Sequence, residues 1–294
     1  MQSFDTPRGV DLRITNRAGH VEVTTHDRAV TEVDVVALHP DAESLAAETR
    51  VAARDRAGRL EVVVEVPESP PRPESLSQVG VQVRAPHRAG LTAVTASADV
   101  RAHGQYADGE IRTASGDVTI LDVAGDLSVR TASGDIDVAS VGGDLRADSA
   151  SGDQRVHAAA GPASLHTASG DIRIDRAEAS LEVRAASGDV RIGQALGDLT
   201  AQTASGDVRA DCLHQGKMSV QSAAGDITLG VAPGTLLHVD AQTLSGDTSS
   251  EIPLDEDGGA DAGAGSGRGG SPVVELRAKT VSGDIRVVRA PVER

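Results

Sequence analysis

Apolar and polar residues alternate in short runs along most of the chain, and these runs recur every 18 residues. Three and five residues after the serine of a recurring Ser-Gly-Asp motif, the chain holds mostly Val or Ile. A second alternating run precedes the motif, and its apolar positions are mostly Leu, Val and Ala. Apolar residues at i and i+2 are typical of a strand with one buried face. Each repeat therefore predicts two short strands and two turns.

The Ser-Gly-Asp motif fixes the register of these strands. Six copies follow one another at intervals of 18 residues, a degenerate copy precedes them, and looser copies follow. The copies begin at Ser97, Ser115, Ser133, Ser151, Ser169, Ser187, Ser205, Ala224, Ser245 and Ser282. Glycine permits a tight turn, and the neighbouring Ser and Asp side chains can hydrogen-bond to backbone groups of the turn.

One repeat cannot bury its apolar side alone, but a stack of repeats pairs each strand with its copies and makes the apolar columns continuous. The sequence therefore predicts an all-β fold, a parallel β-solenoid of about ten rungs with strands about 4.8 Å apart. The aromatic content, Phe4 and Tyr106 with no Trp, suits such a thin interior. We expect the Val and Ile columns to be buried.

The chain divides into four predicted segments. Residues 1–90 lack the strict repeat and predict an irregular β cap continuous with the stack, because a solenoid needs a cover for its terminal rung. Residues 91–254 form the Ser-Gly-Asp solenoid. Residues 255–272 are rich in Gly and Asp and predict a disordered loop. Residues 273–294 hold the C-terminus and the final rung, which resumes the stack at Thr280–Val288.

Within the cap, alternating segments predict strands, and one segment predicts a short helix. We expect this helix at Asp41–Ala47 with Asp41 as its N-cap. A surface loop is expected at Glu68–Ser75, which holds Pro70, Pro71 and Pro73. The strands are predicted at Val10–Ile14, Val21–Thr25, Glu32–Ala37, Leu60–Val66 and Val79–Arg84, and Arg50–Ala53 is expected to form a hairpin with Leu60–Val66.

Charge and hydropathy narrow the choice of partners. The formal net charge of −16 argues against nucleic acid and anionic membranes, because both are polyanions. The N-terminus shows no basic segment followed by an apolar stretch, and no run of about 18 apolar residues occurs. We therefore expect a cytoplasmic protein with a protein partner, no nucleic acid and no membrane span.

The outward positions of the repeat place a column of carboxylates beside a line of guanidinium groups. The Asp of the motif recurs from Asp99 to Asp284. Two residues after it, on the same side of the strand, stand Arg155, Arg173, Arg191 and Arg209. We expect each Arg to pair with the Asp of its own turn, and the four form a possible interaction stripe. Stacked carboxylates also leave open a calcium-binding structural β-roll, although calcium requires more oxygen ligands than one Asp per turn supplies.

Other candidate chemistry has less support. A cryptic carbohydrate-active hydrolase is a further alternative, but the aromatic residues of a sugar cleft are missing. His157 and His166 fall on different edges of a rung, which does not favour a metal or general-base site. Cys212 is more typical of a small buried residue than of a nucleophile. We predict no catalytic, cofactor-binding or metal-ligating residues and no cofactor.

The repeated motif resembles that of a bacterial family of β-strand-repeat proteins of unknown function, which carries the label "putative adhesin"; related domains are called toastrack domains. The resemblance lies in Thr113–Val118, Thr131–Ile136, Thr167–Ile172, Thr203–Val208 and the opening Leu12–Val23. It implies a stack of short strands and a role in cell-surface, stress-response or scaffold contexts. The family offers no catalytic residues to transfer. Together with the surface chemistry, this predicts a non-enzymatic scaffold or protein-interaction module.

Overall fold

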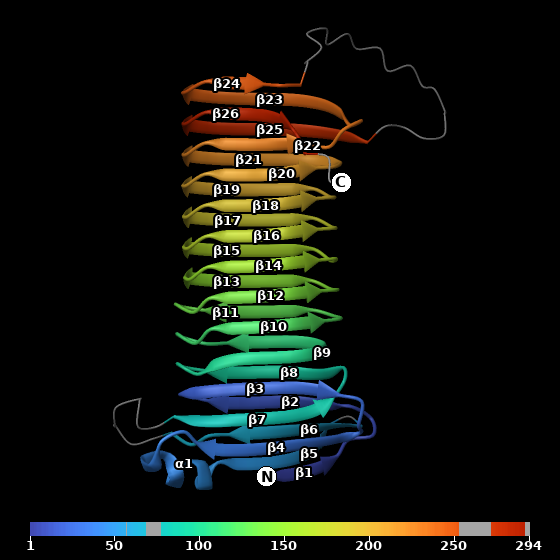
Figure 1. Ribbon diagram of the computed structural model, residues 1–294, viewed down its shortest axis with the longest axis vertical. Coiled ribbons are helices and arrows are strands. Elements are labelled where there is room, and N and C mark those ends of the chain that lie inside the picture. The colour runs from blue at the N-terminus through green and yellow to red at the C-terminus, as the bar shows by residue number, and fades with distance from the viewer. Residues whose placement is uncertain (57, 69–77, 253–271, 292–294) are drawn as a thin grey trace.

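The protein is a single column of stacked β-strands, described here from a computed structural model. The structure describes residues 1–56, 58–68, 78–252 and 272–291. Strands of successive repeats pair in parallel and form two opposed faces around one core (Figure 1). The predicted all-β parallel solenoid with an irregular N-terminal cap is confirmed. No helix in the described part of the chain is long and apolar enough to cross a membrane.

Face 1 carries the strands that follow each Ser-Gly-Asp turn. Its repeat strands within residues 118–213 pair in parallel at one-to-one register, so that Val118 lies beside Ile136 and Ile172 beside Val190. Its strands, in the order of the stack, are β1 (Gln2–Asp5), β4 (Val30–Ala37), β7 (Val79–Pro86), β3 (Gly19–His26), the first half of β9 (Asp99–Arg112), β10 (Val118–Val123), β12 (Ile136–Val141), β14 (Gln154–Ala159), β16 (Ile172–Ala177), β18 (Val190–Ala195), β20 (Val208–Leu213), β22 (Ile227–Val231), β26 (Ile285–Arg289) and β24 (Thr248–Ser250).

Face 2 carries the strands that precede each turn. The long strand β9 crosses from one face to the other, because its first half pairs with β3 and β10 and its second half with β8 and β11. The strands of face 2, in the order of the stack, are β5 (Arg50–Arg56), β6 (Arg59–Glu65), β2 (Val10–Asn16), β8 (Ala89–Thr95), the second half of β9, β11 (Leu127–Thr131), β13 (Leu145–Ser151), β15 (Ala163–Ser169), β17 (Leu181–Ser187), β19 (Leu199–Ser205), β21 (Gly216–Ala224), β25 (Val273–Ser282) and β23 (Leu236–Ser245).

The predicted Val and Ile column of face 1 is buried. Its members at 1% exposure or less are Val100, Val118, Ile136, Ile172, Val190, Val208, Ile227 and Ile285. Gln154 occupies the same column and is also buried; its Nε2 donates to the His166 carbonyl oxygen at 2.6 Å. A hydrogen bond to the opposite face thus satisfies the amide nitrogen of this buried side chain, whereas its Oε1 is buried without a partner among the described residues.

The order of rungs in the stack differs from their order in the sequence at the C-terminal end. The rung of β25 and β26 lies between the rung of β21 and β22 and that of β23 and β24. The prediction that the last segment of the chain forms the final rung is therefore wrong. The inner positions explain the order, since Ile285 and Val287 need cover on both sides, whereas Thr248 and Ser250 in the same columns are exposed at the end.

At the N-terminal end, too, the order of rungs in the stack differs from their order in the sequence. The rung of β2 and β3, early in the sequence, lies between the rung of β6 and β7 and that of β8 and β9. The cap then ends in antiparallel strands, because β4 pairs with β7, β1 with β4, and β5 with β6. The predicted hairpin of the cap is therefore confirmed.

The short helix of the cap, predicted at Asp41–Ala47, consists of two parts. A 3₁₀ turn at Pro40–Ala42 leads into α1 (Glu43–Glu48). The N-cap of the 3₁₀ turn is His39, whose Nδ1 accepts a hydrogen bond from the Asp41 N–H at 3.2 Å. The N-cap of α1 is Ala42, so the prediction of Asp41 as N-cap is wrong. Proline fits the first helical position, which moves the cap back to the residue before it. The loops predicted at Glu68–Ser75 and 255–272 lie almost wholly outside the described residues.

Burial of the inner column makes a direct prediction for Val190, which is 0% exposed. Val190→Asp should lower the free energy of unfolding by about 3 kcal/mol or more, because the carboxylate enters an apolar stack with no partner. Gln202→Asp, an outward position on β19 beside Arg184, is the matched control and should cost far less. Chemical denaturation measures both, and equal losses would contradict the inward assignment.

Candidate functional site: an aspartate ladder beside an arginine stripe

The Ser-Gly-Asp turns of successive rungs are stacked in close contact. A Cβ added at Gly188 would collide with the carbonyl oxygen of Gly170, one rung below, and Gly188 also has a φ of +135°. The same collision recurs at the motif glycines on either side. The threonine two residues before the motif is buried beneath the turn; Thr113 and Thr131 accept hydrogen bonds from the Gly116 and Gly134 N–H groups. Close approach of two backbones therefore requires glycine here.

The aspartates of the motif form a continuous hydrogen-bonded ladder. Each backbone N–H in this column donates to Oδ1 of the aspartate one rung below, at 2.8–3.2 Å. The ladder follows the order of the stack, since Asp226 accepts from Asp284 and Asp284 from Asp247. The Asp247 N–H lowers the pKa of Asp284, with a smaller effect from Arg286. The aspartate side chain thus links neighbouring rungs rather than closing its own turn.

This ladder bears on the calcium alternative. One oxygen of each carboxylate already accepts a backbone hydrogen bond, which leaves Oδ2 as the second oxygen of each rung. Calcium takes 6–8 oxygen ligands. Within the described residues, no cluster of three or more His, Cys, Asp or Glu side chains has the geometry to hold a metal ion.

The four arginines of the predicted stripe lie side by side on face 1. Arg155, Arg173, Arg191 and Arg209 are direct neighbours on adjacent strands. All four are exposed, with 55–62% of the side-chain surface accessible for the three that form ion pairs. On adjacent parallel strands, their Cα atoms repeat at about 4.8 Å.

The ion pairs of the stripe differ in part from the prediction. Arg191 pairs with the Asp189 of its own turn at 3.6 Å, as expected. Arg173 and Arg209 instead use Nε to bind Asp175 and Asp211, two residues further along the strand, at 2.9 and 2.6 Å. Asp175 and Asp211 occupy the next outward position of the strand after Arg173 and Arg209, whereas Gly193 occupies that position after Arg191. Arg191 therefore uses the free Oδ2 of its own turn aspartate.

The ladder and the stripe line one shallow groove of about 330 Å³ on face 1. Its lining includes turn aspartates from Asp117 to Asp189 together with Arg155, Arg173 and Arg191. Arg173 and Arg209 bind Asp175 and Asp211 through Nε, so their Nη groups take no part in these ion pairs. The groove therefore offers guanidinium donors in a regular line.

A histidine links three rungs at the edge of the stripe. The Nδ1 atom of His157 lies 2.8 Å from Asp175 Oδ2, and Nε2 lies 3.7 Å from Asp137 Oδ1. Burial raises the pKa of Asp175, but the hydrogen bonds and charges of Arg173 and His157 outweigh it, so this pKa lies below its usual value. The carboxylate stays ionised, and the cluster is an ion-pair network on an open face.

His166 lies on face 2 and belongs to a separate network. Its Nδ1 is 3.2 Å from Asp148, which Arg130 and Arg146 also contact at 3.3 and 2.8 Å. Burial raises the pKa of Asp148, but Arg146 and His166 bring it below its usual value. The two histidines are thus on different faces, and each is held by carboxylates of neighbouring rungs.

The family of the chain follows from a sequence comparison. The family described as Toastrack DUF4097 matches residues 82–162 and 125–288, which together cover more than half of the chain. The chain belongs to this toastrack family. No curated protein matches the chain.

Several solved structures are similar to this toastrack chain at low identity. A "putative adhesin" from Bacteroides fragilis is 12% identical with a TM-score of 0.42, covering 97% of this chain and 95% of that one. A "putative adhesin" from Parabacteroides distasonis is 10% identical with a TM-score of 0.33, covering 97% and 95%. A "putative cell adhesion protein" from Clostridium sporogenes is 9% identical with a TM-score of 0.23, covering 96% and 92%.

The sequence located the arginines of this toastrack surface but not the ladder bonds. The interval of 18 residues placed the aspartates in one column, yet it did not show that each carboxylate binds the next rung. The sequence also holds the signal for Asp175 and Asp211, because both follow an Arg by two residues, the spacing of outward neighbours on a strand.

Cys212 is half-buried on β20, and its Sγ lies 3.4 Å from His214 Nε2.

The ladder predicts different effects for two substitutions of Asp171, whose Oδ1 accepts from the Asp189 N–H at 2.9 Å. Asp171→Ala removes the acceptor and should lower the free energy of unfolding by about 1–2 kcal/mol. Asp171→Asn keeps a carbonyl oxygen in the same place and should cost less than half as much. Urea denaturation of the pair measures the bond itself, and identical losses would show that the acceptor oxygen of the ladder does not stabilise the fold.

Proposed function

We propose that this toastrack chain is a non-enzymatic scaffold that binds an extended acidic segment of a partner protein along the arginine stripe. The observation that carries the proposal is the line of four exposed arginines on adjacent strands beside a groove. A planar guanidinium presents several donors and binds carboxylates or phosphates in pairs. A phosphorylated segment of a protein satisfies the same donors as one rich in Asp or Glu.

The surrounding charge makes the stripe distinctive. The chain carries a formal net charge of −16, and the stripe gathers cationic groups in one line that carboxylates border on both sides. Exposed ion pairs contribute only about 0–1 kcal/mol each, so the existing bonds of Arg173 and Arg209 can be exchanged for those of a ligand. Salt screens such contacts, and binding should therefore weaken steeply as ionic strength rises.

The open shape of the surface supports a binding role over a catalytic one. The cluster of Asp137, His157 and Asp175 holds acid and base groups, but it lies on the exposed face of a flat sheet. Catalytic sites normally enclose their substrate and exclude water. The stress-response or cell-surface setting that the resemblance implies stays a prediction.

The stripe can be tested with a matched pair of double variants. Arg173→Gln with Arg191→Gln removes the centre of the stripe, whereas Arg130→Gln with Arg184→Gln removes two exposed arginines of face 2 and the same net charge. Fluorescence anisotropy with a labelled oligoglutamate peptide should show a Kd raised roughly tenfold by the first pair only.

The same experiment includes the outcome against the proposal. Both double variants should keep the melting temperature of the parent within a few degrees, because exposed ion pairs stabilise little. If the peptide binds equally to both variants, or if its affinity is independent of salt, the stripe is not the binding surface.

A further inference from the structure

The C-terminal end of the stack presents an open strand edge. Among the described residues, β23 pairs only with β25, so one side of its backbone has no strand beside it. The edge strand β5 at the other end carries Arg50, Arg54, Asp55 and Arg56, charges of the kind that prevent edge-to-edge pairing. β23 has the sequence LLHVDAQTLS and lacks this density of charge.

The open edge also exposes apolar side chains of the core. Leu237, Val239 and Ala241 are only partly buried, although they pack against the core cluster. Their neighbours one rung inward, Val274, Leu276 and Ala278, are at most 2% exposed. On face 1, the end strand β24 holds the polar residues Thr248, Ser249 and Ser250. The end of the stack is therefore apolar on face 2 and polar on face 1.

We propose that β23 pairs antiparallel with β23 of a second copy of this chain, about a two-fold axis through Val239 that is perpendicular to the two faces. Rotation by 180° about this axis reverses the direction of β23 and joins the two stacks end to end. Face 1 of one copy then lies on the same side as face 1 of the other, and likewise for face 2. It therefore places β23 on β23 and β24 on β24, so apolar residues meet apolar ones. A two-fold axis parallel to the strands would instead place apolar β23 on polar β24.

Backbone directions fix which residues of β23 are available for this pairing. The Leu236 N–H donates to the Pro272 carbonyl oxygen at 2.8 Å, towards β25. Along a parallel ladder alternate residues bond to the same neighbour, so the N–H and C=O groups of Leu237, Val239 and Ala241 point away from the stack. In the proposed antiparallel pairing, Val239 of each copy donates its N–H to the carbonyl oxygen of Val239 in the other copy, and Leu237 and Ala241 pair in the same way.

Side-chain chemistry selects the same register. With Val239 on the axis, Leu237 lies opposite the second copy's Ala241, and His238 lies opposite the second copy's Asp240. Moving the axis by one residue places Asp240 opposite itself or His238 opposite itself. Opposite charges stabilise directly facing positions, and like charges destabilise them. This chain is therefore complementary to its own copy in one register.

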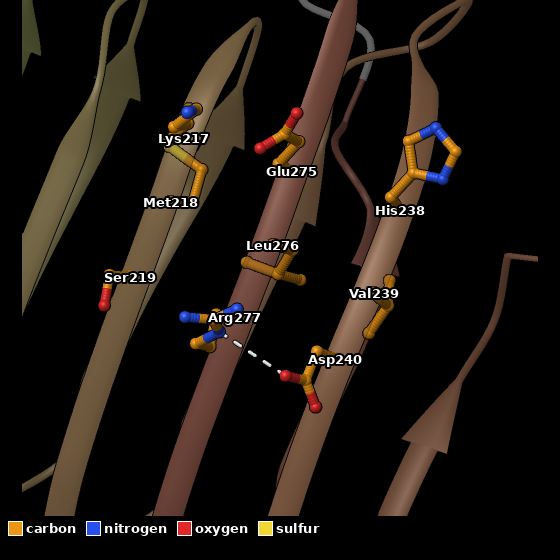
Figure 2. Close-up of a pocket in the computed structure, with 9 residues that line it drawn as sticks. All are labelled: Lys217, Met218, Ser219, His238, Val239, Asp240, Glu275, Leu276 and Arg277. Atoms are coloured by element: carbon orange, nitrogen blue, oxygen red, sulfur yellow. Dashed lines mark ion pairs between the residues drawn. The ribbon is translucent and has the colours of Figure 1, made fainter. Parts of the chain in front are cut away.

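Figure 2 shows His238, Val239 and Asp240 in succession along β23, beside a hollow of about 680 Å³ on face 2. Arg277 lies 3.4 Å from Asp240 and the pair is exposed, so Asp240 can face a second cation across the edge. Glu275 is the neighbour of His238 on β25. A cation at position 238 therefore has a carboxylate on both sides in the paired form.

Sedimentation velocity of the full chain over a range of concentrations tests the proposal. The parent should form a dimer. Val239→Lys places a charge on the axis opposite its own copy and should raise the dimer dissociation constant at least tenfold. Val94→Lys replaces an exposed apolar residue of β8, remote from this edge, and should leave the dimer unchanged. A parent that is monomeric at every concentration would overturn the proposal and leave the edge to a different protein.

A second variant keeps the test decisive if Val239→Lys disturbs the end rung. His238 is exposed, and His238→Lys adds a full charge between Glu275 and the second copy's Asp240. Its dimer should be several-fold tighter at low salt than that of the parent. A dimer that responds to neither substitution forms through another face, and a His238→Lys dimer that is weaker than the parent contradicts the proposed register.

Discussion

The structure depends on how closely the backbone of one rung approaches the backbone of the next at the Ser-Gly-Asp turn. At Gly188, no side chain fits between the turn and the Gly170 carbonyl. This approach brings the Asp189 N–H within 2.9 Å of the Asp171 carboxylate and holds the threonine column beneath the turns. Once the turns are in register, the strands on both sides have no freedom to slip. The inner columns and the arginine stripe are consequences of that register.

Much of this could be predicted from the sequence because a repeat of constant length converts spacing directly into neighbours. Val190 beside Val208 and Arg173 beside Arg191 follow from the interval alone. The order of the end rungs could not be predicted in this way, because spacing does not say which copy lies outermost. The polar residues Thr248 and Ser250, at positions where other rungs hold Ile or Val, were the available signal for the terminal rung. The ladder bonds also needed coordinates, since an aspartate can bond within its turn or between turns.

The middle and the end of this toastrack chain support different kinds of interaction. In the middle, outward columns such as the turn aspartates and the arginines repeat the same side chain about 4.8 Å away, so these surface features form lines rather than points. The arginine stripe is such a line, and it suits an extended ligand. At the end the repetition stops, and β23 has an unpaired backbone edge with partly exposed apolar residues. That edge suits a strand, whereas the stripe suits anionic groups.

The central claim is that close backbone approach, rather than the backbone conformation of glycine, sets the register of the stack. Two substitutions separate these causes: Gly134 has no positive φ, but the Gly116 carbonyl oxygen is in the way of any Cβ, whereas Gly234 has a φ of +81° and an added Cβ there meets nothing within 4 Å. The free energy of unfolding should fall by about 1–2 kcal/mol in Gly234→Ala, from conformational strain alone. It should fall by roughly 3 kcal/mol or more in Gly134→Ala, from the collision alone. Equal losses in the two variants would contradict the account.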